Sequence, residues 1–280
     1  MMKELVVIGN PINHSLTPII YKAALKNLGL SKKIKTNKIR LKTDELEQFV
    51  NLVREEKIHG ANITIPYKRK IIKFLDKLTP AATLIKAVNV VYKKDNKIIG
   101  ENTDFVGFEN SLIENNIAVF GKKAIVIGAG GASRAIAFAL SDLGLKDLVI
   151  LNRNLSKAEE LEKIIKTRFK IRTKIGKLDL LNEQIIDADI LINCTPVGMK
   201  GKFENISLIP EKLLHSNLIV IDIVYNPILT KLIADAKKKD LKTIDGSRMF
   251  LHQAAASFEI FTNKKPSLKV MEKALYEVLK

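Results

Sequence analysis

The sequence contains a single cysteine, Cys194, among its 280 residues. One cysteine cannot form a disulfide within the chain, which is typical of proteins kept in a reducing compartment. No apolar run approaches the length that spans a membrane, and the N-terminal run Leu5–Ile8 is too short for the core of a signal peptide. These absences argue against secretion and membrane insertion, so we expect a cytoplasmic protein without a membrane partner.

Two classes of catalytic motif are also missing. The four histidines are far apart in the sequence and lack nearby clusters of acids or further cysteines, so we expect no metal site. The G-x-x-x-x-G-K-S/T loop that binds phosphates in nucleotide hydrolases is absent as well. The sequence therefore supports neither a metal centre nor nucleotide hydrolysis.

Acidic residues are outnumbered by basic ones, 30 to 47, which gives a formal net charge of +17. A charge of this sign and size makes nucleic acid one class of partner to consider. The lysines are scattered along the chain rather than gathered into one stripe, so we interpret the charge as a general bias of composition. We predict no nucleic-acid partner. An anionic small-molecule substrate and a dinucleotide cofactor both fit a basic protein.

The length and the hydrophobic content of 46% are sufficient for two ordinary domains, each with its own core. Strand-like and helix-like segments alternate almost from end to end, a pattern typical of α/β proteins with mostly parallel sheets. We predict an N-terminal α/β domain over residues 1–104, completed by the C-terminal helices 247–280. Residues 105–246 are predicted to form a second α/β domain, with a cleft between the two.

The expected elements can be given by residue range. In the first domain we expect a strand at 3–9, followed by a helix that is capped by Thr17, has Pro18 in its first turn and stops near Gly29. A second helix is expected at about 43–57, a strand at 61–65 and a helix at 67–78. A hairpin is expected over 87–101, with its turn at Asp95-Asn96. In the second we expect strands at 123–128, 148–152, 171–175, 189–194, 218–223 and 242–245. Ser156 and Glu159 have the spacing of a capping box. The stretch 247–280 is predicted to form two helices.

The strongest local signal is at residues 124–135, where a buried strand runs into a glycine-rich turn and then an apolar helix. Gly128 permits the tight turn, and Gly130 and Gly131 allow the backbone to approach a pyrophosphate at the N-terminus of the helix. Ser133 occupies the third glycine position of the usual motif, so the pattern is G-x-G-G-x-x-x-A. The complete strand, turn and helix predict a Rossmann-type dinucleotide site.

The choice of cofactor depends on the end of the second strand of this domain. An NAD enzyme usually has an acidic residue there that binds the ribose 2′-hydroxyl. This chain has Asn152 and Arg153, with Lys157 one turn later. A guanidinium pairs with a 2′-phosphate through two hydrogen bonds, whereas a carboxylate would repel it. We therefore predict NADP, with a solvated loop position as the alternative role of Arg153.

Polar residues also follow the expected strands of the first domain. Ser15 and Thr17 lie at the start of a helix, where their hydroxyls and free backbone N–H groups form a receptor for a carboxylate. Thr64 ends a strand, and Lys68 follows a proline turn. Taken alone, Thr17 could serve only as a helix cap, and Lys68 could be one more solvated cation. The two segments Ala87-Val-Asn89 and Gly100-Glu-Asn-Thr-Asp104 extend the same series of polar strand ends.

These motifs, in this order, resemble those of the shikimate dehydrogenase family, and the resemblance covers essentially the whole chain. It also includes Ile192-Asn-Cys-Thr-Pro-Val-Gly-Met199, Asp222-Ile-Val-Tyr-Asn-Pro227 with Thr230, and the segment from Gly246 to Gln253-Ala-Ala. The resemblance implies reversible reduction of 3-dehydroshikimate to shikimate, a step in chorismate and aromatic amino acid biosynthesis, with hydride passing between the nicotinamide C4 and the substrate C3.

The resemblance also implies a role for individual residues. Lys68 would be the catalytic proton donor and acceptor, and Asp104 would hold a substrate hydroxyl and orient Lys68. The residues implied to surround the substrate are Ser15, Thr17, Thr64, Asn89, Asp104, Tyr225 and Gln253. Those implied to contact the cofactor are Gly128, Ala129, Gly130, Gly131, Ala132, Asn152, Arg153, Lys157, Thr195, Ile223 and Gly246.

Two alternatives stay open at this point. Thr17 stands where many members of the family have Ser, and Thr there also occurs in relatives that use quinate, so a quinate/shikimate dehydrogenase of broader specificity is one alternative. A non-catalytic NADP-binding regulator on the same scaffold is the other, although such a protein need not retain both Lys68 and Asp104. Either a monomer or a homodimer is compatible with the sequence.

Overall fold

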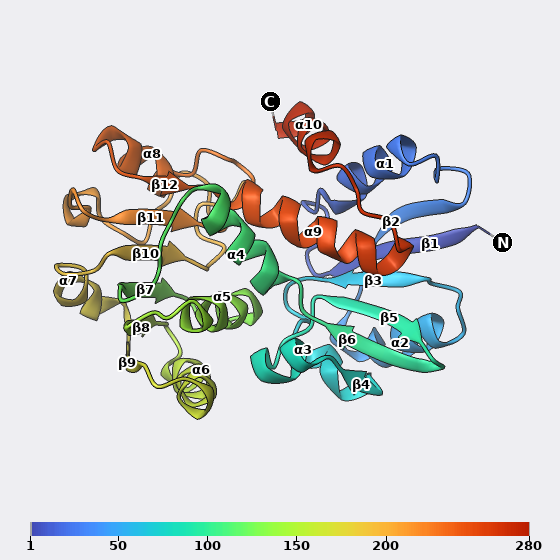
Figure 1. The fold of residues 1–280 in the computed structure, drawn as a ribbon, viewed down its shortest axis with the longest axis horizontal. Coiled ribbons are helices and arrows are strands. Elements are labelled where there is room, and N and C mark those ends of the chain that lie inside the picture. Colours follow the sequence, from blue (N-terminus) through green and yellow to red (C-terminus); the bar gives the residue numbers. More distant parts are fainter. Residues whose placement is uncertain (1, 280) are drawn as a thin grey trace. The chain divides into compact units, whose positions relative to one another are not determined.

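A computed structural model describes residues 2–279 of the chain. The chain divides into two compact units, one formed by the described residues up to Asp104 together with those from Leu251 onward, the other by Phe105–Phe250. Each unit contains a six-stranded sheet with helices packed on it (Figure 1). The predicted α/β class is confirmed. Within residues 2–279, no helix combines the length and the apolar character needed to cross a membrane.

The sheet of the first unit is mixed, with the strand order β2-β1-β3-β5-β6-β4. Strand β1 pairs in parallel with β2 and β3, whereas β5 runs antiparallel to both β3 and β6. The strands are β1 (Lys3–Gly9), β2 (Ile34–Arg40), β3 (Gly60–Ile63), β4 (Lys77–Leu78), β5 (Val90–Lys94) and β6 (Lys97–Glu101). The helices are α1 (Thr17–Asn27), α2 (Leu46–Arg54), α3 (Pro80–Ile85), most of α9 (Gly246–Thr262) and α10 (Leu268–Leu279), with short 3-10 segments at Thr43–Glu45 and Lys70–Phe74.

The core of this unit follows from the alternation of side chains along its strands. One face of β1 and β3 packs on α2 through a buried apolar cluster that includes Val6, Ile8, Ala61, Ile63, Leu46, Phe49, Val50 and Val53. Elsewhere in the unit, Tyr21 of α1 packs edge-on against Phe258 of α9, with their ring centroids 5.3 Å apart. These contacts hold the start of α1, the end of β3 and the middle of α9 to the same sheet.

The sheet of the second unit is entirely parallel, with the order β12-β11-β10-β7-β8-β9. This is the doubly wound order, in which the chain direction across the sheet reverses between β7 and β10 and ligands bind at the carboxyl ends of the strands. The strands are β7 (Lys123–Ile127), β8 (Asp147–Leu151), β9 (Arg172–Gly176), β10 (Ile190–Asn193), β11 (Ile219–Asp222) and β12 (Thr243–Ile244). The helices are α4 (Asp104–Glu114), α5 (Gly131–Asp142), α6 (Leu155–Arg168), α7 (Leu181–Gln184) and α8 (Lys231–Lys238), with 3-10 turns at Leu178–Leu180 and Glu211–Leu213.

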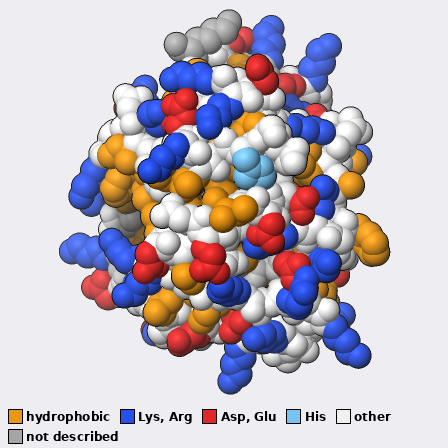
Figure 2. Space-filling model, turned by 90° about the vertical axis from the view of Figure 1, so that its left-hand side faces the viewer, with side chains coloured by type: hydrophobic (Ala, Val, Ile, Leu, Met, Phe, Trp, Pro, Cys, Tyr) orange, Lys and Arg blue, Asp and Glu red, His pale blue; other side chains and the backbone are white. Residues whose placement is uncertain are grey.

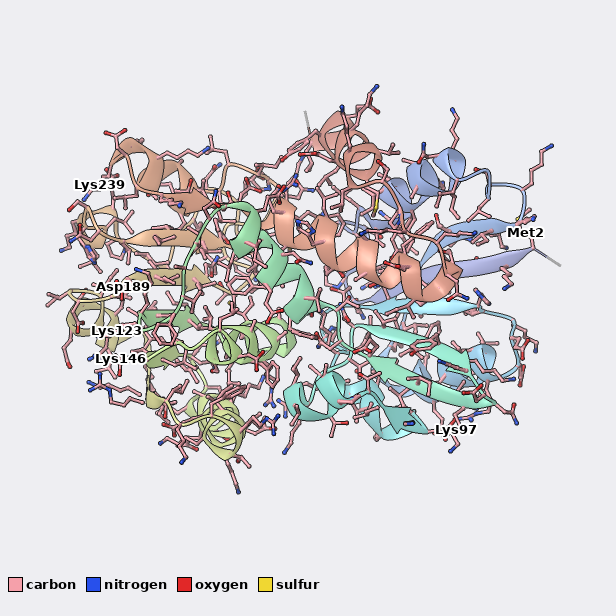
Figure 3. All side chains as sticks on the ribbon, in the orientation of Figure 1. Met2, Lys97, Lys123, Lys146, Asp189 and Lys239 are labelled. Atoms are coloured by element: carbon pink, nitrogen blue, oxygen red, sulfur yellow. The ribbon has the colours of Figure 1, made fainter. Side chains whose placement is uncertain are left out.

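Helices cover both faces of this parallel sheet. Ala124 and Val126 belong to the buried cluster that α4, α5 and α6 complete, whereas Ile125 and Ile127 belong to the cluster that α7 and α8 complete. The start of β10 is fixed to β7 because Asp189 accepts the backbone N–H of Lys123 at 2.8 Å, and Figure 3 labels both residues at this edge of the sheet. A near-continuous apolar sequence in β7, β8, β10 and β11 is the consequence of burial on both faces.

The expected helix over residues 67–78 is wrong. The chain there forms turns, a 3-10 segment and the short strand β4, which pairs in parallel with β6. A carboxylate oxygen of Asp76 accepts the backbone N–H of Ile98 at 2.7 Å and holds this segment to the sheet. Tertiary pairing therefore overrides the local helical pattern. Strand β2 and helix α3 are further elements that the sequence pattern did not predict.

Two expected helix caps are also wrong. Thr17 is the first residue of α1, and the cap position is occupied by Leu16, which makes no side-chain capping bond. In α6 the cap is Asn154, whose side chain accepts the backbone N–H of Lys157 at 3.3 Å, so Ser156 does not start a capping box. Asn at a helix start is among the preferred caps and outcompetes a serine two residues later.

Figure 2 shows how charged side chains are distributed on one face of the molecule. On the face drawn in Figure 2, Lys and Arg side chains are distributed among acidic, apolar and uncharged ones and do not form one continuous stripe. This face therefore lacks the clustered basic footprint that is expected of a nucleic-acid surface.

The predicted hairpin turn offers a test of the fold. Asp95 and Asn96, which connect β5 to β6, both have positive φ, 49° and 58°. Positive φ is unfavourable for a β-branched residue, so Asn96→Val should lower the free energy of unfolding by about 1–2 kcal/mol in a urea titration. Lys94→Val, placed in the adjoining strand, is the control and should change it by less than about 0.5 kcal/mol. Equal destabilisation by the two variants would contradict the assigned turn.

Candidate active site

A buried ion pair lies at the centre of the polar residues of the first unit. Lys68 Nζ donates to Asp104 Oδ2 at 2.5 Å, and the two side chains are only 15% and 5% exposed. The backbone oxygen of Lys68 accepts the N–H of Val88 at 2.7 Å, which fixes the loop that carries the lysine. Because water is largely excluded, the attraction between the charges is stronger than in a surface pair. The pair places a proton donor and a hydrogen-bond acceptor side by side.

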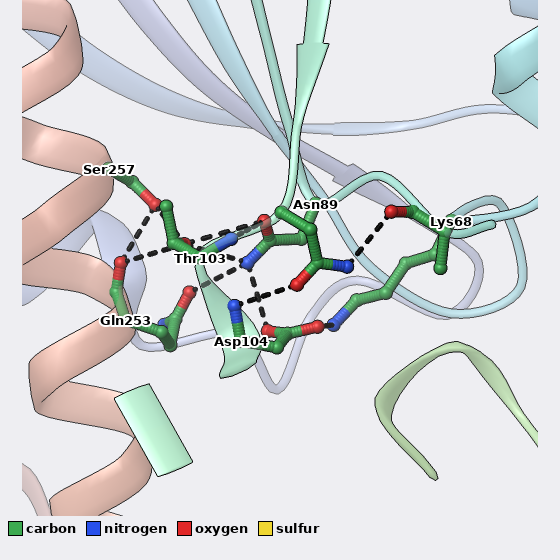
Figure 4. A network of polar contacts seen from close by, with 8 residues as sticks. Lys68, Asn89, Thr103, Asp104, Gln253 and Ser257 are labelled. Carbon is green, nitrogen blue, oxygen red and sulfur yellow. Dashed lines mark hydrogen bonds and ion pairs between the residues drawn. The ribbon is translucent and has the colours of Figure 1, made fainter. Parts of the chain in front are cut away.

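Asn89 fixes the orientation of the Asp104 carboxylate. Its amide nitrogen donates to Asp104 Oδ1 at 2.9 Å and lies 3.3 Å from Gln253 Oε1, while its amide oxygen accepts the backbone N–H of Thr103 at 2.7 Å (Figure 4). Asn89 is buried, and its amide nitrogen also lies 3.0 Å from Thr103 Oγ1. Four of the residues predicted from the sequence, Lys68, Asn89, Asp104 and Gln253, thus form one network.

Three residues that sequence reasoning did not assign support this network. Asn102 accepts the backbone N–H of Asp104 at 3.0 Å, and Thr103 donates to the backbone oxygen of Gln253 at 3.1 Å and lies 2.9 Å from Ser257 Oγ. Asn102 and Thr103 lie inside the motif that ends at Asp104, but the sequence does not indicate a role for either of them. Ser257 is distant in the sequence, and no local pattern around it indicates the contact.

Ser15 and Thr17 form a separate hydroxyl pair at the start of α1. Ser15 Oγ donates to Thr17 Oγ1 at 3.4 Å, and both residues are buried. Because Thr17 does not cap the helix, its hydroxyl keeps its capacity to bind a ligand. Thr64 directly follows β3 and lies against Gly9, where an added Cβ would be 2.5 Å from Thr64 Cγ2. Gly9 is therefore required for this close approach.

Tyr21 and Asn62 lie behind these groups and were not predicted from the sequence. The Tyr21 hydroxyl donates to Asn62 Oδ1 at 2.9 Å and is 3.1 Å from the backbone oxygen of Ala254. Burial raises the pKa of Tyr21, so the phenol stays neutral. These bonds connect α1, which begins at Thr17, with β3, which Thr64 follows, and with α9, which carries Gln253.

In the second unit, the glycine-rich turn after β7 has the geometry that a pyrophosphate requires. Gly128 has φ of +116°, and an added Cβ would lie 3.2 Å from the backbone oxygen of Cys194. Gly130 precedes the first turn of α5, its Cβ position opens into free space, and its N–H donates to Ser133 Oγ at 3.2 Å. An unobstructed helix N-terminus attracts an anion through its N–H groups and its dipole. Ala129, Gly131 and Ala132 complete the turn.

The residues that follow β8 fit a 2′-phosphate. Arg153 and Lys157 are exposed, and within residues 2–279 the Arg153 side chain forms no hydrogen bond or ion pair. The Asn152 amide donates to the backbone oxygen of Asn154 at 2.7 Å and shapes the loop. No carboxylate ends β8, so two cations face solvent where an NAD enzyme would place an acid.

Beyond the carboxyl ends of β10, β11 and β12 lie Thr195, Ile223 and Gly246, respectively. The Thr195 hydroxyl donates to Asn193 Oδ1 at 2.7 Å. Gly246 donates its N–H to the oxygen of Val224 at 3.2 Å, and an added Cβ would lie 2.3 Å from the oxygen of Ile223. Tyr225 belongs to this unit and stacks on Phe250, with ring centroids 4.1 Å apart. Together with the glycine turn, these segments line the edge of the sheet where a doubly wound fold binds a dinucleotide.

Family models match three consecutive parts of the chain. Residues 7–91 match the shikimate dehydrogenase substrate binding domain, residues 111–246 match shikimate / quinate 5-dehydrogenase, and residues 246–276 match the shikimate 5′-dehydrogenase C-terminal domain. The order and the extent of these matches agree with the motifs described above.

Individual relatives are similar over almost their full length. The NADP⁺ shikimate dehydrogenase of Dehalococcoides mccartyi strain CBDB1 is 40% identical over 269 residues, covering 95% of this chain and 93% of the relative. A shikimate dehydrogenase solved with NADP⁺ superimposes with a TM-score of 0.92 at 35% identity, covering 100% of this chain and 96% of the other. The Thermus thermophilus enzyme solved with NADP(H) and shikimate gives 0.86 at 32%, covering 99% and 100%. This chain therefore belongs to the shikimate dehydrogenase family of NADP-linked oxidoreductases.

Proposed function

We propose that this protein catalyses the reversible NADP-dependent reduction of 3-dehydroshikimate to shikimate. The observation that carries the proposal is the buried pair of Lys68 and Asp104, held by Asn89 in the unit that resembles the substrate-binding domain of the family. Burying a charged pair away from water lowers the stability of the folded protein unless other hydrogen bonds compensate the lost hydration. A catalytic function is a reason to keep such a pair. A non-catalytic regulator would have no need to keep both groups in this arrangement.

Lys68 performs the proton transfer. In the direction of reduction, its ammonium group donates a proton to the carbonyl oxygen of the substrate as negative charge develops there, and in oxidation the neutral amine takes the proton back from the hydroxyl. When bound, the nicotinamide supplies or accepts the hydride. Asp104 keeps Nζ of Lys68 in position and accepts a hydrogen bond from a neighbouring substrate hydroxyl.

The remaining polar residues select the substrate. The hydroxyls of Ser15 and Thr17 bind the carboxylate, which the helix N-terminus also attracts. The substrate hydroxyls are bound by Thr64, Asn89, Gln253 and Tyr225. The Thr17 methyl group distinguishes this site from one with Ser, so quinate is the second candidate substrate.

The second unit binds the cofactor. The turn Gly128–Ala132 holds the pyrophosphate, Asn152, Arg153 and Lys157 surround the adenosine 2′-phosphate, and Thr195, Ile223 and Gly246 lie at the nicotinamide end. Hydride transfer requires the cofactor and substrate to meet, so the proposal includes a cleft shared by a substrate domain of residues 1–104 with 247–280 and a cofactor domain of residues 105–246. A cytoplasmic location and a monomeric or homodimeric state stay predictions from the sequence.

The catalytic assignment predicts a specific kinetic result for Lys68→Ala. Without the proton donor, kcat for shikimate oxidation should fall by roughly 10²- to 10⁴-fold, while NADP binding changes little. Lys70→Ala is the control, because Lys70 is an exposed cation nearby whose ammonium group donates to the Thr43 hydroxyl at 3.3 Å. Steady-state kinetics and direct cofactor titration measure both effects. A kcat close to that of the wild type in a Lys68→Ala protein that binds NADP would overturn the assignment.

The cofactor assignment predicts a selective effect of Arg153→Ala. Loss of a charge-assisted bond to the 2′-phosphate should raise the KM for NADP, by an amount that corresponds to up to about 1.5–3 kcal/mol of binding free energy. The KM for NAD should stay nearly unchanged. Arg168→Ala, at an exposed position at the other end of α6, is the control for loss of a surface charge. Equal weakening of NADP and NAD by Arg153→Ala would contradict the role in binding the 2′-phosphate.

A further inference from the structure

Asp222, the last residue of β11, is a buried carboxylate that the proposed reaction does not use. It is completely inaccessible to solvent, and within residues 2–279 no Lys, Arg or His forms an ion pair with it. Burial raises the pKa of this carboxyl to about 6, and the hydrogen bonds from Thr230, Val224 and Asn193 act in the opposite direction. A buried carboxylate without a cationic partner costs stability unless hydrogen bonds compensate it, so the donors around Asp222 indicate what the group does.

The carboxylate is held by three donors from three segments. Oδ1 accepts the Asn193 amide N–H at 2.9 Å and the backbone N–H of Val224 at 3.1 Å, and Oδ2 accepts the Thr230 hydroxyl at 2.7 Å. Thr230 also caps α8, where it accepts the backbone N–H of Ile233. A carboxylate only accepts hydrogen bonds, so it matches a site at which all three partners are donors.

The first consequence concerns the loop after β10. Because Asp222 accepts from the Asn193 nitrogen, the Asn193 oxygen must point the other way, where it accepts both the backbone N–H and the hydroxyl of Thr195 at 3.1 and 2.7 Å. The same Asn193 nitrogen donates to the oxygen of Val197 at 2.9 Å. The hydrogen bond to the Asp222 carboxylate therefore sets the orientation of one amide, and that amide sets the shape of the Thr195 loop.

The second consequence concerns the segment after β11. Asp222 holds the N–H of Val224, and the oxygen of Val224 accepts the N–H of Gly246. Ile223 and Tyr225 flank Val224, and Tyr225 is fixed further by its stacking on Phe250. One carboxylate thus anchors both segments that carry the residues assigned to the nicotinamide end of the cofactor.

We propose that Asp222 is a positioning residue that aligns the Thr195 and Ile223 segments so that they hold the nicotinamide ring in the orientation required for hydride transfer. This inference rests on the proposed NADP-dependent function. The adenosine end of the cofactor is bound by residues after β7 and β8, which Asp222 does not contact. Loss of the Asp222 carboxylate should therefore weaken binding of the nicotinamide end more than binding of the adenosine end.

The test uses Asp222→Asn in the full-length protein, because Asn keeps the shape of the side chain but removes its charge and replaces one of the two acceptor oxygens by an N–H donor. The matched control is Asp235→Asn, which changes another buried carboxylate of the same unit, one that pairs with Lys231 on α8 and contacts neither segment. Two ligands are titrated: NADPH, and 2′,5′-ADP, which lacks the nicotinamide. The kcat for shikimate oxidation by NADP is measured alongside.

In Asp222→Asn we expect kcat to fall about tenfold or more, as a small misplacement of a reacting group does. The ratio of the NADPH dissociation constant to that of 2′,5′-ADP should rise about fivefold, and the affinity for 2′,5′-ADP should stay within about twofold of the wild type. Asp235→Asn should leave kcat and this ratio unchanged even if its melting temperature falls. Equal weakening of both ligands, or an unchanged ratio with an unchanged kcat, would overturn the proposal.

Asn193→Ala is a second variant, which leaves Asp222 with the donors Val224 and Thr230. It tests the proposal if the Asp222→Asn protein does not fold. The same rise in the ratio is expected, and its absence would count against the proposal. If the wild-type protein does not oxidise shikimate, the proposed function fails, but the ratio of the two dissociation constants still tests Asp222. The two failures are therefore distinguishable.

Discussion

The site in the first unit depends on keeping a lysine and an aspartate charged while both are nearly buried. Burial strengthens their attraction but removes their hydration, so each remaining lone pair and proton needs a partner. Asn89 occupies one oxygen of Asp104, Lys68 occupies the other, and Asn102 holds the backbone of Asp104. The mixed sheet serves this end, since β5 and β6 bring Asn89 and the 101–104 segment together with the Lys68 loop.

The second unit also contains a buried carboxylate, Asp222, but holds it with neutral donors instead of a cation. A parallel sheet directs the carboxyl ends of β7, β8, β10 and β11 to one edge, where the glycine turn, Arg153 and the Thr195 and Ile223 segments follow. Asp222 stabilises two of these segments without a cationic partner, by accepting hydrogen bonds from three neutral donors. The two units thus show two ways of burying a carboxylate, pairing with a lysine at Asp104 and three neutral hydrogen-bond donors at Asp222.

All six strands of the second unit were predicted from the sequence. Four of them, β7, β8, β10 and β11, were clear because parallel strands buried on both faces are nearly continuous apolar runs. The hairpin at Asp95-Asn96 was equally clear, since these residues tolerate positive φ. Residues 67–78 were predicted wrongly because their apolar spacing suits a helix, whereas Asp76 and the pairing of β4 with β6 draw them to the sheet. The motifs identified Lys68, Asn89, Asp104 and Gln253, but Tyr21, Asn62 and Ser257 act through contacts between distant segments that leave no local pattern. Asp222 was part of a recognised motif, and only its burial and its three donors indicate a role.

The central claim is that the wild-type protein is an NADP-dependent shikimate dehydrogenase. The most direct measurement follows the absorbance of the reduced cofactor with shikimate or quinate as substrate, each combined with NADP or NAD. The account predicts the highest kcat/KM for shikimate with NADP, with NAD disfavoured because it offers Arg153 and Lys157 no 2′-phosphate. Absence of turnover with shikimate and NADP in a protein that binds the cofactor, or a higher kcat/KM with quinate or NAD, would contradict it.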